Sequence, residues 1–86
     1  MPIQVSKPTP EQIKETESWG DWAKEPSEFP WSYDQTETCY ILSGKATVAC
    51  GDQSVDFGAG DWVVFPKGLE CTWKIRETIK KKYKFS

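Results

Sequence analysis

The sequence contains no histidine, and its three cysteines form neither a CxxC pair nor a zinc-ribbon spacing. Without histidine, a cysteine nucleophile lacks the base that usually generates its thiolate, which argues against cysteine-dependent catalysis. Without cysteine pairs at short spacing, a zinc ribbon is excluded. The odd number of cysteines, Cys39, Cys50 and Cys71, favours free thiols in a reducing compartment.

Long apolar runs are absent as well. No run reaches the roughly 18 residues of a membrane span, and no signal peptide is recognisable. We therefore expect an intracellular, cytoplasmic protein with no membrane partner. An organelle protein with a cleaved transit peptide remains compatible with the sequence.

The sequence also has no basic surplus. Its formal net charge is −2, whereas binding to nucleic-acid phosphates requires a clear excess of lysine and arginine. We therefore expect no nucleic-acid partner. The one basic cluster, Lys80-Lys81-Lys82 with Lys84, is interpreted as having a solvated or an edge-strand role.

The N-terminal segment is predicted to form an arm with one helical turn. Residues 1–8 include two prolines and are expected to be extended. Thr9-Pro10-Glu11-Gln12 is a good helix start, because Thr9 can cap the helix and Gln12 completes a capping box. The helix is expected to end near Ser18. Trp19 and Trp22 are interpreted as apolar anchors of this arm.

From Phe29 onward the pattern predicts short β-strands separated by turns. Turns are predicted at Ser43-Gly44-Lys45, Gly51-Asp52, 58–61 and Pro66-Lys67-Gly68. Spacing of this kind indicates an all-β sandwich or barrel rather than alternating strands and helices. The predicted strands are Thr38–Leu42, Ala46–Cys50, Gln53–Phe57, Trp62–Phe65, Cys71–Arg76 and Thr78–Phe85.

Two spaced motifs carry a family resemblance. Gly60 to Gly68 has the pattern Gly-x5-Pro-x-Gly, and Glu37 is separated from Gly44 by six residues. Together, in this order, they resemble the two halves of the cupin signature. The chain is similar to small cupins of the ethanolamine-utilisation and ureidoglycine-aminohydrolase type, many without an assigned function. The resemblance implies one small cupin barrel, a double-stranded β-helix or jelly roll, over residues 19–86, preceded by an arm over residues 1–18.

The residues that would form the cupin metal centre are largely replaced. The resemblance implies three histidines and a glutamate, but Trp31, Tyr33 and Cys71 stand in the histidine positions and only Glu37 remains. Glu37 and Cys71 would be the ligands of any atypical divalent metal. Two ligands are too few for a tight site, so no metal cofactor is predicted.

The resemblance directs the side chains in these positions into one barrel mouth. Strand alternation adds Cys39 and Ile41 after Glu37, and Trp73 and Ile75 after Cys71. The predicted ligand-binding residues share an inward orientation in aromatic surroundings; they are Trp31, Tyr33, Glu37, Cys39, Cys71 and Trp73. Such a pocket suits a small polar or aromatic metabolite, whereas small barrels can also be filled by their own side chains.

Glu37 is the strongest functional candidate, because an inward carboxylate in a β-segment is costly unless something satisfies it. Tyr33 can donate its hydroxyl to Glu37. The two are predicted to act as an acid/base pair or to anchor a ligand. Cys71 is interpreted as inert or weakly ligating.

Three functions remain open from the sequence. The preferred one is binding of a small molecule without the usual metal centre. The second is an isomerase, dehydratase or hydrolase that uses Glu37 with Tyr33, or an atypical metal on Glu37 and Cys71. The third is a structural or interaction protein with a filled barrel. The family resemblance and the extended arm also suggest a homodimer.

Overall fold

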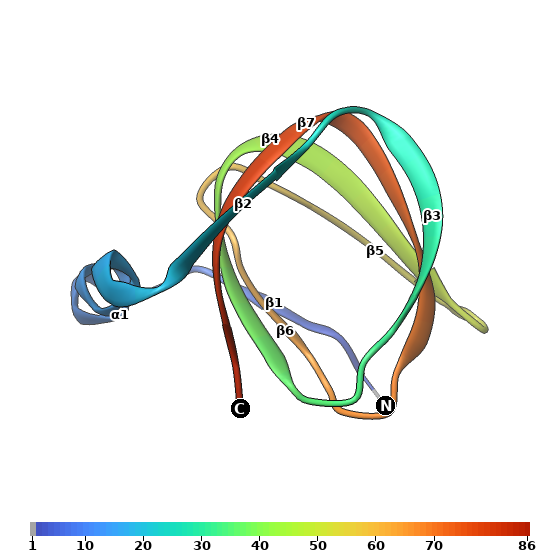
Figure 1. Ribbon diagram of the computed structural model, residues 1–86, viewed down its shortest axis with the longest axis horizontal. Coiled ribbons are helices and arrows are strands. Elements are labelled where there is room, and N and C mark those ends of the chain that lie inside the picture. The colour runs from blue at the N-terminus through green and yellow to red at the C-terminus, as the bar shows by residue number, and fades with distance from the viewer. Residues whose placement is uncertain (1) are drawn as a thin grey trace.

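In the described part of the chain, seven antiparallel strands close into a ring, and the helical turn stands to one side of it (Figure 1). The computed structural model describes residues 2–86. In chain order the elements are β1 (Gln4–Ser6), α1 (Pro10–Glu15), the 3-10 helix η1 (Thr16–Ser18), β2 (Gly20–Lys24), β3 (Ser27–Ser32), β4 (Glu37–Cys50), β5 (Gln53–Gly58), β6 (Trp62–Phe65) and β7 (Glu70–Phe85). The predicted all-β cupin barrel with a short helical turn is confirmed.

The arm begins as the sequence predicts. Thr9 caps α1: the Gln12 amide donates to the Thr9 hydroxyl, and the Thr9 amide donates to Gln12 Oε1, which are the two hydrogen bonds of a capping box. β1 pairs with β6 of the same chain, which ties the extended segment to the barrel. Among the described residues, neither helix has the length or apolar character that crossing a membrane requires.

Two long strands form the frame of the barrel. β4 pairs with β7 along most of its length, while its N-terminal half also pairs with β6 and its C-terminal half with β5. β7 likewise pairs with β3 through its first half and with β2 through its second. Because each long strand bends across the molecule, residues at its two ends serve different parts of the barrel.

The sequence prediction divided two continuous strands and started the β-structure too late in the chain. Ser43-Gly44-Lys45 is not a turn, because β4 continues through it with register shifts between Ile41 and Ala46. β7 is likewise one strand rather than two, and strands form before Phe29, in β1 and in β2. The glycine signal at Gly44 has its reason in a positive φ of 95°, which bends the strand without reversing it.

The core is aromatic and centres on Trp73. Its ring lies 5.3 Å from Phe65, 5.5 Å from Phe57 and 6.2 Å from Phe29, measured between ring centroids. Phe65 in turn stacks on Tyr33 with the planes 7° apart. These contacts supply much of the apolar burial that a chain of 86 residues needs.

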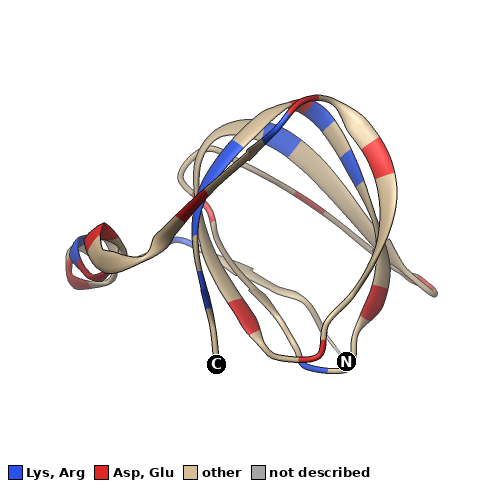
Figure 2. Cartoon of the chain, in the orientation of Figure 1, with Lys and Arg blue, Asp and Glu red and all other residues tan. Residues whose placement is uncertain are grey.

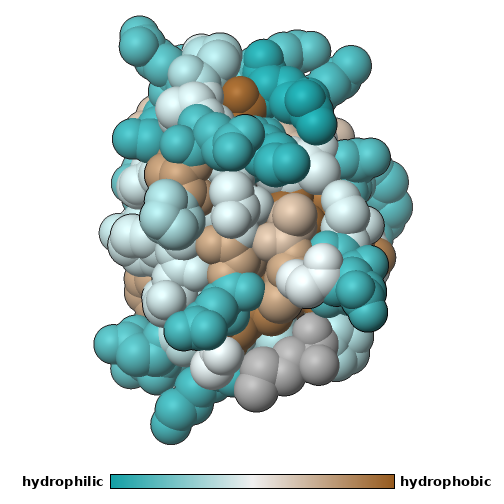
Figure 3. All heavy atoms as spheres, turned by 90° about the vertical axis from the view of Figure 1, so that its right-hand side faces the viewer, coloured by the Kyte–Doolittle hydropathy of each residue, from teal (hydrophilic) through white to brown (hydrophobic). Residues whose placement is uncertain are grey.

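The outer surface is mixed in character. Both basic and acidic residues occur on the strands of the ring, with several basic segments close together on the upper strands (Figure 2). The face at the right of Figure 1 shows apolar patches bordered by hydrophilic side chains (Figure 3). The small net charge predicted from composition is therefore spread over the barrel.

Gly44→Ala is expected to lower the free energy of unfolding by at least about 2 kcal/mol. Alanine at this position would have to adopt a positive φ, and its Cβ would overlap the backbone of Thr78. Gly51→Ala is the matched control, because Gly51 also has a positive φ, 56°, but no atom lies within 4 Å of its added Cβ. Urea unfolding measures both; equal losses would contradict the role assigned to the Thr78 contact.

Candidate functional site

A cavity of about 220 Å³ lies among β2, β3, β7 and the start of β4. We call it the aromatic mouth. Its walls are seven aromatic rings and its polar lining is one acid and one base; the residues are Trp22, Phe29, Trp31, Tyr33, Trp73, Tyr83, Phe85, Glu37 and Lys81. Glu37 is only 4% exposed and Lys81 only 5%, whereas Trp31 is 49% and Phe85 41% exposed. The charged pair therefore lies at the inner end and the exposed rings form the rim.

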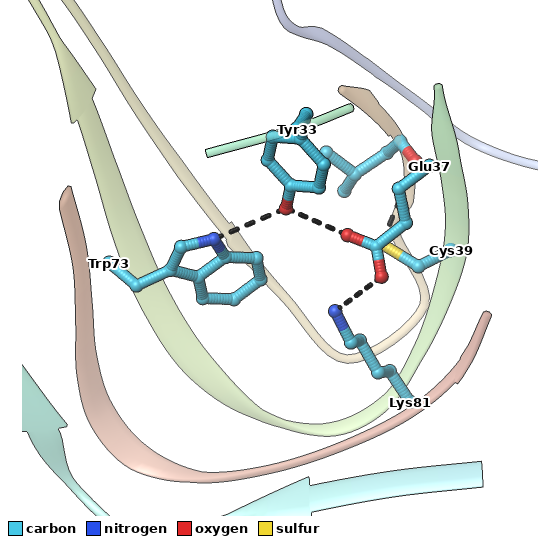
Figure 4. Close-up of polar contacts among 6 residues, drawn as sticks. Tyr33, Glu37, Cys39, Trp73 and Lys81 are labelled. Atoms are coloured by element: carbon cyan, nitrogen blue, oxygen red, sulfur yellow. Dashed lines mark hydrogen bonds and ion pairs between the residues drawn. The ribbon is translucent and has the colours of Figure 1, made fainter. Parts of the chain in front are cut away.

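Glu37 and Lys81 form a buried ion pair. The Lys81 Nζ lies 2.9 Å from Glu37 Oε2. The two residues face the same side of neighbouring strands. Lys81 on β7 pairs with Ile41 on β4, which lies two residues after Cys39. The long lysine stem spans the remaining distance to Glu37, and Figure 4 shows the contact.

The ammonium group of Lys81 is also held between two indole rings. Its Nζ lies 4.7 Å from the ring centroid of Trp22 and 4.6 Å from that of Trp73. A desolvated cation over an aromatic face gains about 2 kcal/mol or more, which offsets part of the cost of burial. The lysine is thus fixed by one carboxylate and two π-faces.

The other oxygen of Glu37 is bound by Tyr33, as the sequence predicts. The Tyr33 hydroxyl donates to Glu37 Oε1 at 2.7 Å and accepts from Trp73 Nε1 at 3.3 Å (Figure 4). Burial, and then the negative charge of Glu37, raise the pKa of Tyr33 far above its ordinary value. Tyr33 therefore keeps its proton and acts as a hydrogen-bond donor rather than a phenolate.

The backbone joins the two cupin motifs beside this site. The Gly68 amide donates to the Tyr33 carbonyl at 2.7 Å, and the Tyr33 amide donates to the Leu69 carbonyl at 2.9 Å. Gly68 has a φ of 90°, a conformation that glycine adopts without strain. The turn after β6 therefore fixes the residue that orients Glu37.

The interpretation of the lysine cluster was wrong for Lys81. β7 lies between β4 and β2 in the sheet order, so it is not an edge strand. Lys80 and Lys84 are exposed, but Lys81 shares the inward face with Ile79 and Tyr83. Alternation from these apolar neighbours is the signal that could have identified it, and the run of three lysines obscured that signal.

Four of the six predicted ligand-binding residues line the aromatic mouth: Trp31, Tyr33, Glu37 and Trp73. Cys39 and Cys71 are buried but are not among the described residues that line it. The Cys39 thiol points to the Val63 carbonyl and the Cys71 thiol to the Trp31 carbonyl, each at 3.6 Å. Ile41 and Ile75 pack in the core and do not reach the cavity either.

The residues present do not fit a cupin metal centre. Within residues 2–86, no group of three or more histidine, cysteine, aspartate or glutamate side chains could hold a metal ion. Both oxygens of Glu37 are bound, one by Tyr33 and one by the ammonium of Lys81. A positive charge is therefore already in place beside the one acid that the family's ligand set retains.

Breaking the ion pair should destabilise the protein strongly. Lys81→Met is expected to lower the free energy of unfolding by about 3–5 kcal/mol, because Glu37 would be left as a buried charge held by Tyr33 alone. The double variant Glu37→Gln/Lys81→Met should lose less than the sum of the two single variants, since neither charge remains unpaired. Urea unfolding gives all three values, and strict additivity would show that the pair is not coupled.

Cysteine reactivity should follow burial. Burial raises the pKa of Cys39 to about 12 and that of Cys71 to about 11. At pH 8 only about one Cys71 side chain in a thousand is then a thiolate. Iodoacetamide should therefore modify the half-buried Cys50 first. In urea all three should react alike. Labelling of Cys71 as fast as Cys50 in the folded protein would contradict this assignment.

Comparison with known proteins identifies the family of this chain. The EutQ-like cupin domain profile matches residues 11–83. A DUF861 family protein from Thermotoga maritima is 48% identical, with a TM-score of 0.94 over 99% of this chain and 100% of that one. None of the curated proteins compared with the chain matches it.

More distant solved structures share the fold. The putative ethanolamine utilization protein Q of Salmonella typhimurium is 21% identical, with a TM-score of 0.71 over 96% of this chain and 68% of that one. The EutQ protein of Clostridium difficile is 16% identical, with a TM-score of 0.70 over 94% and 64%. The chain thus belongs to the EutQ-like cupin domain family and is similar to a DUF861 protein of unknown function.

Proposed function

We propose that the protein binds a small, flat organic molecule in the aromatic mouth, with the polar end of that molecule against Glu37 and Lys81. The observation that carries the proposal is a cavity whose walls are aromatic and whose inner end holds a fixed ion pair. Ligand sites commonly combine apolar walls with a few placed polar groups.

The size of the cavity restricts the ligand. An apolar cavity of about 150 Å³ can hold benzene. The aromatic mouth, at about 220 Å³, therefore has room for one six-membered ring with a small substituent, or for an aliphatic metabolite of similar size. Drug-sized ligands need cavities of about 300 Å³ or more, so larger ligands would have to extend past the rim.

The filled-barrel alternative explains the interior but not the mouth. Phe57, Phe65 and Trp73 pack against one another and fill the centre. Beyond them the rings of Trp31 and Phe85 remain exposed at the rim. Exposed aromatic surface beside a cavity favours a binding site over a structural plug.

Catalysis without a metal is a second candidate. One observation favours it: Tyr33 and Glu37 both line the cavity and lie within 2.7 Å of each other. Glu37 is then the group that exchanges a proton with a bound substrate, and Tyr33 orients it. An isomerisation or dehydration can use such a positioned carboxylate as its general acid or base.

Benzyl alcohol is a suitable probe, because it has one ring and one small polar group. It should change the intrinsic fluorescence, since Trp22, Trp31 and Trp73 line the cavity. Trp31→Ala should weaken binding about tenfold, the loss of roughly 1.4 kcal/mol of ring contact.

Leu42→Ala is the matched control. Leu42 is 45% exposed and does not line the aromatic mouth, so its truncation should leave binding unchanged. Saturation-transfer NMR measures both variants. Equal affinity of the two variants, or no binding by wild type, would contradict the proposed function.

A further inference from the structure

We propose that Lys81 is a nucleophile that forms an imine with a small aldehyde or ketone in the aromatic mouth. The inference rests on the proposed function, because the carbonyl compound must first enter that cavity. Lys81 is the one buried lysine of the described chain, and it lines the cavity. It is therefore the lysine that a bound molecule would meet.

The surroundings of Lys81 keep water away from its amine. Its Nζ lies between the rings of Trp22 and Trp73 and is screened from water. In such a water-excluded site an imine, once formed, is protected from hydrolysis. Lys80, its neighbour in sequence, is exposed and lacks this environment.

An acceptor for the ammonium proton is already in contact. Glu37 Oε2 lies 2.9 Å from Nζ, within the range of a direct proton transfer. Its other oxygen is held by Tyr33, whose own proton is retained because burial raises its pKa. Glu37 is therefore the base available to Lys81, and Tyr33 is a positioning residue.

The reaction balances with these groups alone. Lys81 transfers one proton to Glu37, and the freed lone pair forms a bond to the carbonyl carbon while the C=O π bond breaks. The oxygen takes the proton from Glu37, giving a carbinolamine. Loss of a second nitrogen proton to that oxygen releases water as the C–O bond breaks and C=N forms. One ammonium and one carbonyl thus give one iminium and one water.

The product preserves the electrostatics of the site. The iminium nitrogen keeps the positive charge of the ammonium, so Glu37 remains paired after the reaction. The substituents on the imine carbon would pack against the aromatic walls of the cavity. The cavity volume of about 220 Å³ restricts the carbonyl compound to roughly the size of benzaldehyde.

Reductive trapping tests the inference on the wild-type protein. Benzaldehyde with sodium cyanoborohydride converts the iminium to a stable benzylamine, which peptide mass mapping locates. At limiting aldehyde, Lys81 should be modified at least about tenfold more than Lys80, because the cavity holds the reactants together. Equal modification of Lys81 and the exposed lysines would overturn the inference.

Two variants give a matched comparison. Lys81→Arg keeps a positive charge beside Glu37 but cannot form the imine, and it should abolish the selective adduct. Lys80→Arg should leave the adduct on Lys81 unchanged. Near-UV circular dichroism checks the fold of both variants. A selective adduct elsewhere that survives in Lys81→Arg would also overturn the inference.

Benzyl alcohol separates this inference from the proposed function. It has the same ring as benzaldehyde but no carbonyl group. If both compounds bind in NMR and no Lys81 adduct is trapped, imine formation is wrong and the binding function stands. If neither binds, both proposals fail.

Discussion

The buried ion pair between Glu37 and Lys81 is the constraint to which the rest of the site conforms. Removing two opposite charges from water costs several kcal/mol per ion, and Coulomb attraction repays this only with good geometry and further partners. Tyr33 supplies one partner on the acid, and the rings of Trp22 and Trp73 supply others on the base. The total stability of a domain this size is only about 4–13 kcal/mol, so these contacts are a large fraction of it.

The strand frame explains how these groups meet. Glu37 begins β4, and Lys81 lies well inside β7, the central partner of β4. The bend at Gly44 lets β4 continue along β7 instead of folding back on itself. The backbones of the pair are thus placed by the pairing of two neighbouring strands, and the turn after β6 holds Tyr33, which orients Glu37.

Much of the fold and part of the site could be predicted from the sequence, for physical reasons. The spacing of Gly60 from Gly68 and that of Glu37 from Gly44 reflect backbone requirements, so they identified the barrel. The need to satisfy an inward Glu37 pointed to Tyr33. Lys81 was missed because a lysine run suggests solvent, although Ile79 and Tyr83 set the face. Cys39 and Cys71 do point inward, but strand alternation does not say whether an inward residue meets core or cavity.

The ammonium of Lys81 beside Glu37 has a consequence for how the site is supplied with charge. A bound metal is acquired after folding, and its occupancy depends on availability and can be reversed by chelators. A lysine is present in every copy as soon as translation ends, and its amount is always one per chain. The positive charge beside Glu37 is therefore determined by the gene alone and stays constant when the metal content of the cell changes.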